Sequence, residues 1–455
     1  MKAFRRWEGS RGGEPLRRRV GGAPATLLFS LFLAAVFPAR LAARTPPEDG
    51  GGQAEDAGRP GLKSRLAEGG IVPDLTYFGE VFGSVSGGLK PGAVYIGNLS
   101  LTLALDLDRL AGWRGGSLFF YGMNLQDGDP EAYFGDLQGV SSIAAPGTTK
   151  LYEAWLEQGF LDGRLTLLAG LYDLNSEFDV LESASVFMNP SQGIDPTFAL
   201  SGLNGPSVFP YTTLGFRAGF KSAGFYVRSA VLNGLAGNPD HPGGTRVVIR
   251  KGTGFLAVLE TGYHFPIVPG RHVKPPKRRR VRRYVQPTYA GKIALGLWGY
   301  TSRFAPVFPG PEPSPDIRGD RGLYGLVSHT VWRDGDIPGR NVMAFARVGL
   351  ANPRINRLGL FTGGGLVLTG LVPGRSLDIA GLAFAAAFNG DEYMRKAVAE
   401  GSPVRRAEWN FELTYQAAIL SWLGLHPDLQ FIVHPGTDPG LRNAFGFDLR
   451  VEISL

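Results

Sequence analysis

The last eleven residues of the chain alternate between apolar and polar side chains without interruption. The apolar set is Phe445, Phe447, Leu449, Val451, Ile453 and Leu455, and the polar set is Gly446, Asp448, Arg450, Glu452 and Ser454. Because side chains alternate between the two faces of a strand, this pattern predicts a two-faced β-strand at the C-terminus. A soluble sandwich accepts the same pattern, whereas apolar residues outside and charges inside are typical of a transmembrane barrel.

Glycine and cysteine usage narrow the fold class. The 66 glycines in 455 residues are about twice the usual share of roughly 7%, while 11% of the residues are aromatic and 19% are charged. This mixture suits many strands joined by tight turns. The chain has no cysteine, which excludes a disulfide scaffold, a thiolate metal site and a cysteine nucleophile.

The N-terminus resembles a secretory signal. A basic stretch over residues 5–19 precedes an apolar run over 26–37 and a small-residue end at 41–43, so we predict a signal peptide over 1–43. The run is too short to cross a hydrocarbon core of about 30 Å. Without this segment 39 Lys and Arg face 38 Asp and Glu, so the charge gives no indication of nucleic-acid binding.

Residues 44–70 are predicted to be a flexible tail, since their Pro-, Gly- and acid-rich first part has almost no large apolar residue. From residue 71 to 455 we predict an all-β domain, an antiparallel transmembrane barrel of about 16 strands. The expected strands are 71–85, 92–105, 116–124, 151–160, 164–172, 213–220, 223–232, 254–265, 288–301, 321–333, 341–350, 359–370, 376–388, 408–421, 427–434 and 441–454.

The connections alternate in length. The long ones follow strands 3, 5, 7, 9 and 13, and the shortest, Asp162–Gly163 and Lys221–Ser222, follow strands 4 and 6. A barrel with both ends in the periplasm requires long external loops and short periplasmic turns in this order.

One connection, 266–287, follows an even strand and yet is long, Pro-rich and basic. Its cations are Arg271, Lys274, Lys277, Arg278, Arg279, Arg280, Arg282 and Arg283. One interpretation is a solvated charge run. The other is a periplasmic arm over 271–283 that contacts an anionic partner such as the cell-wall polymer.

Two-faced strands recur in the interior of the chain. In the strand from 408, Glu408, Asn410, Glu412, Thr414 and Gln416 share one face, opposite a largely aromatic and aliphatic face. An aqueous lumen explains the first face, and outer-membrane lipid explains the second. The side chains expected to line the lumen and to meet solute are Glu153, Glu157, Arg217, Arg228, Arg347, Glu408, Glu412 and Arg450. Each of them taken singly also suits a wall charge with no role toward solute.

The longest connection, 173–212, contains four phenylalanines among several Gly and Pro residues. Its aromatic content is unusual for a disordered loop. It either folds into the lumen and narrows the channel or forms an ordered external cap. The candidates for a constriction are Asp173, Asn175, Glu177 and Phe178.

Three blocks of sequence resemble the carbohydrate-selective porins of the OprB family. They are Leu151–Gln158 with Leu168–Phe178, the segment Asn204–Tyr211, and Glu408–Tyr415 with His426–Gly436. The resemblance implies a 16-stranded barrel in the bacterial outer membrane that passes sugars passively, with arginines and acidic residues at its constriction. It implies no catalysis and no cofactor.

Enzyme signatures are missing from the sequence. It contains neither G-x-S-x-G nor H-E-x-x-H, and the six histidines are scattered, so we predict no catalytic residue and no metal ligand. The alternative function is a surface-exposed β-protein that binds glycans without conducting, like an adhesin or a lectin.

Overall fold

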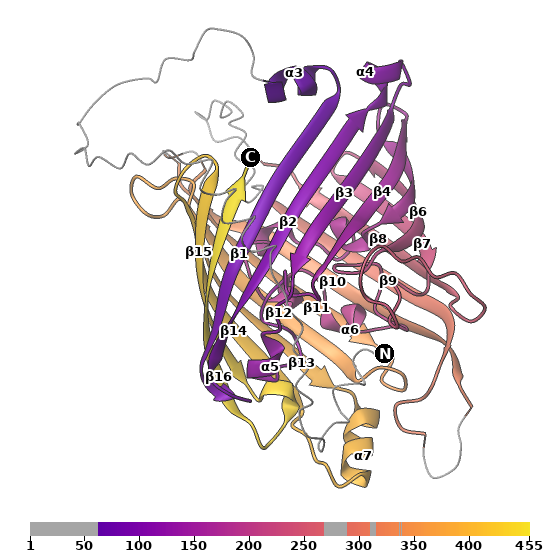
Figure 1. The fold of residues 1–455 in the computed structure, drawn as a ribbon, viewed down its shortest axis with the longest axis vertical. Helices are drawn as coiled ribbons and strands as arrows, with labels where there is room; N and C mark the ends of the chain where they lie inside the picture. The colour runs from indigo at the N-terminus through magenta and orange to yellow at the C-terminus, as the bar shows by residue number, and fades with distance from the viewer. Residues whose placement is uncertain (1–61, 268–288, 310–314, 336, 338) are drawn as a thin grey trace, which may run out of the picture. The chain divides into compact units, whose positions relative to one another are not determined.

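The computed structural model of the chain describes residues 62–267, 289–309, 315–335, 337 and 339–455. The predicted signal peptide (1–43) and the basic segment 271–283 lie outside these residues. The folded unit from Lys63 to Leu455 is a closed antiparallel barrel in which each strand pairs with its neighbour in sequence and β1 pairs with β16 (Figure 1).

The sixteen predicted strands are all present. They are β1 Ile71–Gly88, β2 Gly92–Asp106, β3 Gly116–Gln126, β4 Thr148–Phe160, β5 Leu165–Tyr172, β6 Thr213–Ser222, β7 Phe225–Asn233, β8 Phe255–Phe265, β9 Gly291–Phe304, β10 Ile317–Arg333, β11 Asn341–Ala351, β12 Leu358–Thr369, β13 Ile379–Asn389, β14 Ala407–Ala418, β15 Leu423–Val433 and β16 Arg442–Ser454. The predicted fold class is therefore confirmed.

The strand bounds differ from the predicted ones in two informative places. Strand β15 begins four residues before the predicted start at 427, because its ladder with β16 runs through Pro427 and includes His426 opposite Arg450. The turn after β6 is Ala223–Gly224, two residues beyond the predicted one. Both residues have a positive φ, of 50° and 85°, as a type I′ hairpin turn requires.

Short helices lie in the connections. They are α3 Leu62–Glu68, α4 Leu107–Ala111, α5 Glu131–Phe134, α6 Pro196–Ala199 and α7 Asp391–Ala399, with 3₁₀ turns η1 Leu174–Ser176, η2 Glu182–Ala184, η3 Pro190–Gln192 and η4 Pro435–Thr437. Helix α3 is a correction to the flexible tail predicted over 44–70. The Arg109 guanidinium stabilises its C-terminal end by donating to the carbonyls of Ala67 and Glu68. Among the described residues, no helix is long and apolar enough to cross a membrane.

The two faces of the wall have inverted polarity. On β16, Phe447 and Leu449 are 43% and 41% exposed, whereas Asp448 is 1% and Arg450 is 9% exposed. On β14, Phe411 and Leu413 are likewise exposed, while Glu408, Asn410, Glu412 and Thr414 are buried. The apolar face therefore points outward and the charged face inward, as the terminal strand predicted for a transmembrane barrel.

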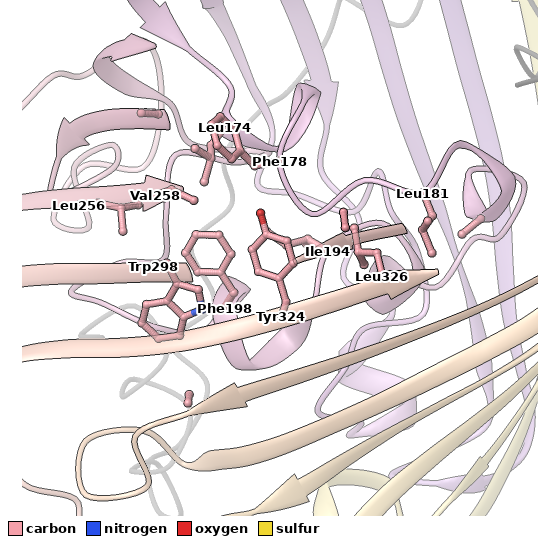
Figure 2. Packing of buried hydrophobic residues seen from close by; sticks show 14 of the residues in the cluster. Leu174, Phe178, Leu181, Ile194, Phe198, Leu256, Val258, Trp298, Tyr324 and Leu326 are labelled. Carbon is pink, nitrogen blue, oxygen red and sulfur yellow. The ribbon is translucent and has the colours of Figure 1, made fainter. Parts of the chain in front are cut away.

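The connection 173–212 packs inside the barrel against the inner wall of β7 to β13. Phe198 of α6 stacks on Trp298 of β9, with ring centroids 5.1 Å apart, and also on Tyr324 of β10 (Figure 2). Opposite Asp195 the wall carries Gly349, where an added Cβ would lie 1.6 Å from a carboxylate oxygen of that aspartate. Of the two predicted arrangements, the loop thus has the one inside the lumen and not the external cap.

Candidate functional site

The inner loop is tied to the wall by charged side chains. The guanidinium of Arg347, on β11, pairs with the Asp179 carboxylate at 2.6 Å, and neither side chain is exposed. The same guanidinium donates to the main-chain carbonyls of Asp179, Ser191 and Gln192. One buried arginine therefore satisfies acceptors from both ends of the segment 179–192.

Two wall glutamates accept main-chain N–H groups from the same segment. Glu412 on β14 accepts from Met188 and Asn189, the latter at 3.2 Å. Glu260 on β8 accepts from the Asp179 N–H at 2.9 Å, as well as from two tyrosine hydroxyls.

A second connection, 127–147, also folds inward, although it follows β3 and was expected only as one of the long external loops. The N–H groups of Leu137 and Gln138 donate to the Glu408 carboxylate at 2.7 and 3.1 Å. The amide of Gln430 on β15 donates to the Val140 carbonyl at 2.8 Å. Buried apolar side chains of this connection, Phe134 and Val140, pack against β1, β15 and β16 residues.

Arg450 supports this second loop from β16. It forms an ion pair of 2.6 Å with Glu80 on the neighbouring strand β1 and donates to the Ser142 hydroxyl at 3.3 Å. The Glu80 side chain is fully buried. Arg450 therefore joins the wall to the loop.

Two of the predicted solute residues that keep some exposure, Glu157 and Glu177, pair with Arg217 on β6. Its guanidinium pairs with Glu157 of β4 and, at 2.7 Å, with Glu177 of the inner loop. The arginine side chain is only 5% exposed, but those of Glu157 and Glu177 are 27% and 31% exposed. The wall and the loop meet here with carboxylate oxygens that solvent reaches.

Arg228 on β7 extends this group. It donates to the Glu177 carbonyl at 2.7 Å, and its guanidinium carbon lies 4.3 Å from the ring centroid of Tyr226 and 5.9 Å from that of Phe178. The Arg228 side chain is 17% exposed, whereas Phe178 is fully buried in the apolar core of the loop. Of this pair, only Arg228 is accessible to solvent.

The first residues of the inner loop are held by β4. The Asp173 N–H donates to Glu153 at 3.0 Å, and the Asp173 carboxylate accepts from the Asn175 N–H at 2.8 Å, which caps η1. The amide of Asn175 donates to the carbonyls of Phe178 and Gly193. Burial raises the pKa of Asp173 to about 6. These hydrogen bonds fix the first residues of the inner loop against β4.

The predicted solute residues thus divide into two groups. Glu157, Glu177, Arg217 and Arg228 come together beside the loop. The expectation that Glu153, Glu408, Glu412, Arg347 and Arg450 meet solute needs correction, since these side chains are at most 9% exposed and hydrogen-bond to loop residues. Main-chain N–H and C=O groups of an inward loop need partners, and the wall charges supply them.

Several contributors were missed from the sequence. Glu260 carried a usable signal, because it shares the inward face of β8 with Leu256 and Val258. Asp179 carried none, since loop residues have no periodic pattern. In the part of the chain that the structure describes, no group of three or more His, Cys, Asp or Glu side chains could hold a metal ion.

Comparisons with known proteins agree with this geometry. The family model described as "Carbohydrate-selective porin, OprB family" matches residues 90–455. The chain is 23% identical over 430 residues to Porin B of Pseudomonas aeruginosa, covering 86% of this chain and 89% of that protein.

Solved structures show the same fold. The high-pH structure of Pseudomonas putida OprB is similar with a TM-score of 0.73 and 20% identity, over 87% of this chain and 96% of that one. The low-pH structure of the same protein has a TM-score of 0.53 and 16% identity over the same shares of the two chains.

Proposed function

This chain belongs to the carbohydrate-selective porins of the OprB family, and from that premise we propose that sugars cross it beside the inner loop, in contact with Glu157, Glu177 and Arg228, while Arg217 holds the two glutamates in place. The protein is a passive channel for carbohydrates in the bacterial outer membrane. The comparisons give no support to the glycan-binding alternative that does not conduct.

One observation carries the proposal. Arg217 is held between two carboxylates that remain partly open to solvent, one on the wall and one on the loop. Sugar hydroxyls donate to carboxylates and accept from guanidinium groups, and such charge-assisted hydrogen bonds are stronger than neutral ones. Two partly exposed carboxylates held on either side of a fixed arginine therefore offer a polyhydroxyl solute several acceptors in one place.

An aromatic surface lies next to these charges. Trp155 is two residues from Glu157 on β4, and its ring stacks on Phe119 of β3, with centroids 4.9 Å apart. Residues two apart on a strand share a face, so both Trp155 and Glu157 point inward. The aromatic rings offer an apolar surface to the C–H face of a sugar ring, while the charges bind its hydroxyls.

The test is single-channel recording in planar bilayers with graded sugar concentrations. We expect sugars to reduce the current of the unaltered channel, and Glu157→Gln and Glu177→Gln to raise the half-blocking concentration several-fold, because the amide is a weaker acceptor. Glu392→Gln on α7, which removes the same charge elsewhere, is the matched control. A half-blocking concentration unchanged in both site variants would overturn this placement of the sugar site.

A further inference from the structure

Wall side chains supply part of the hydrogen bonds of the inner loop's main chain. Glu412 accepts from the N–H groups of Met188 and Asn189, and Glu260 accepts from that of Asp179. Arg347 supplies the opposite polarity by donating to loop carbonyls. The wall thus presents carboxyl oxygens to loop donors and a guanidinium to loop acceptors, all of them on side chains that are at most 3% exposed.

These three charges lie on three separate strands, β8, β11 and β14. The segment 179–192 is therefore attached at three places along an arc of the wall that spans seven consecutive strands in the barrel order. Side chains on hydrogen-bonded strands have well-defined positions, so they determine the path of a loop more precisely than contacts within the loop would.

We propose that Glu412, Glu260 and Arg347 are positioning residues that set the width of the passage by fixing the path of segment 179–192. They act through the loop and do not touch the sugar. This inference goes beyond the proposed sugar site, because the width of the passage governs the current that salt alone carries. Its test consequently stays informative if the sugar contacts are wrong.

A role in stability alone would lead to a different result for these three residues. If these charges only add stability, their removal lowers the resistance of the barrel to unfolding and leaves the conductance of folded channels as it was. If they fix the loop, folded channels conduct differently. The apolar core around Phe198 and Trp298 keeps part of the loop in place, so we expect a loosened segment and not an empty lumen.

The decisive variant is Glu412→Gln. Glutamine has nearly the same shape, but it offers one acceptor oxygen and directs N–H groups at the donors of Met188 and Asn189. We expect the single conductance level in potassium chloride to be replaced by several levels, with a several-fold rise in open-channel noise. Glu412→Asp keeps two carboxyl oxygens on a shorter side chain, so its noise is expected to lie between those of the other two channels.

Glu260→Gln is the second variant, since it releases the Asp179 end of the same segment through a different strand. Glu392→Gln on α7 is the control for loss of one negative charge. Heat-modifiable migration identifies the folded protein before each recording, and Glu260→Gln decides alone if Glu412→Gln does not fold. The proposal is overturned if a folded channel with either substitution has the single level and the noise of the unaltered channel.

Discussion

Arg347 on β11 and Asp179 in the inner loop form an ion pair of 2.6 Å in which neither side chain is exposed to solvent. The pair joins the middle of the wall to the point where the loop begins its path along the lumen. Asp179 also accepts the main-chain N–H of Asp195 at 2.6 Å, so the same carboxylate connects two parts of the loop.

Replacing one member of this ion pair should lower the free energy of unfolding by more than half of the loss caused by replacing both. Taking away one partner leaves an uncompensated buried charge, with a penalty of about 3–5 kcal/mol. We expect Asp179→Asn and Arg347→Met each to lower the free energy of unfolding in urea, and the double variant to lose clearly less than the sum of the two. Strictly additive losses would show that the two groups are not coupled.

The second inward loop should loosen as pH rises. Both carboxylate oxygens of Asp136 are buried, and burial, with the negative charge of Glu408 next to it, raises the pKa of Asp136 to about 8. The folded state therefore retains a proton that the unfolded chain has released above a pKa of about 4. Stability is full below that value and declines up to about pH 8.

Limited proteolysis of the segment 127–147 measures this effect. Cleavage of the unaltered protein is expected to speed up between about pH 5 and pH 8, because this range lies between the pKa of Asp136 in the unfolded chain and its pKa in the folded protein. Asp136→Asn cannot ionise and should remove the part of the pH dependence that comes from this site. A variant whose cleavage accelerates with pH as strongly as the unaltered protein would exclude Asp136 as the cause.

A charged side chain on the outward face of the terminal strand β16 should destabilise the protein in the membrane. Leu449→Arg introduces a guanidinium on the lipid side of β16, where a charge near the middle of the bilayer costs about 2–4 kcal/mol. We expect a reduced yield of folded, heat-modifiable protein in liposomes. Gln416→Arg, on the inward face of β14, is the matched substitution and should fold nearly as well, and equal yields for both would contradict the assigned faces.

Strand positions were predictable from the sequence because a barrel wall repeats one simple pattern. The alternation of Phe447, Leu449 and Val451 with Asp448 and Arg450 depends only on the period of a strand and on which side is lipid. Turn positions were less certain. The hairpin at Ala223–Gly224 was placed two residues early, since the choice among neighbouring small and polar residues depends on pairing with the next strand.

The interior of the barrel was only partly predictable. Alternation indicated that Glu412 and Arg347 point inward, but it contains no information on what covers them. The aromatic residues of 173–212 suggested that this connection is ordered, and the same reasoning applied to Phe134 and Val140 would have found the second inward loop. Contacts such as the one between Glu408 and the Leu137 N–H join residues far apart in the chain, and no local pattern encodes them.

The basic segment 271–283 remains a separate prediction about a partner. Its sequence fits both interpretations, contact with an anionic cell-wall polymer and a solvated charge run, and does not distinguish them. Deleting residues 272–283 is expected to reduce sedimentation of the protein with purified cell-wall polymer, most clearly at low salt, because screening weakens contacts between exposed charges. Unchanged sedimentation would eliminate the contact.

The most direct test of the account is the current through single channels reconstituted in planar bilayers, recorded in salt while a sugar is added in steps. The account predicts discrete openings whose current falls in a saturable way with sugar concentration, and a weaker response after Glu157→Gln or Glu177→Gln. An absence of channel openings, or openings that sugars never change, would contradict it.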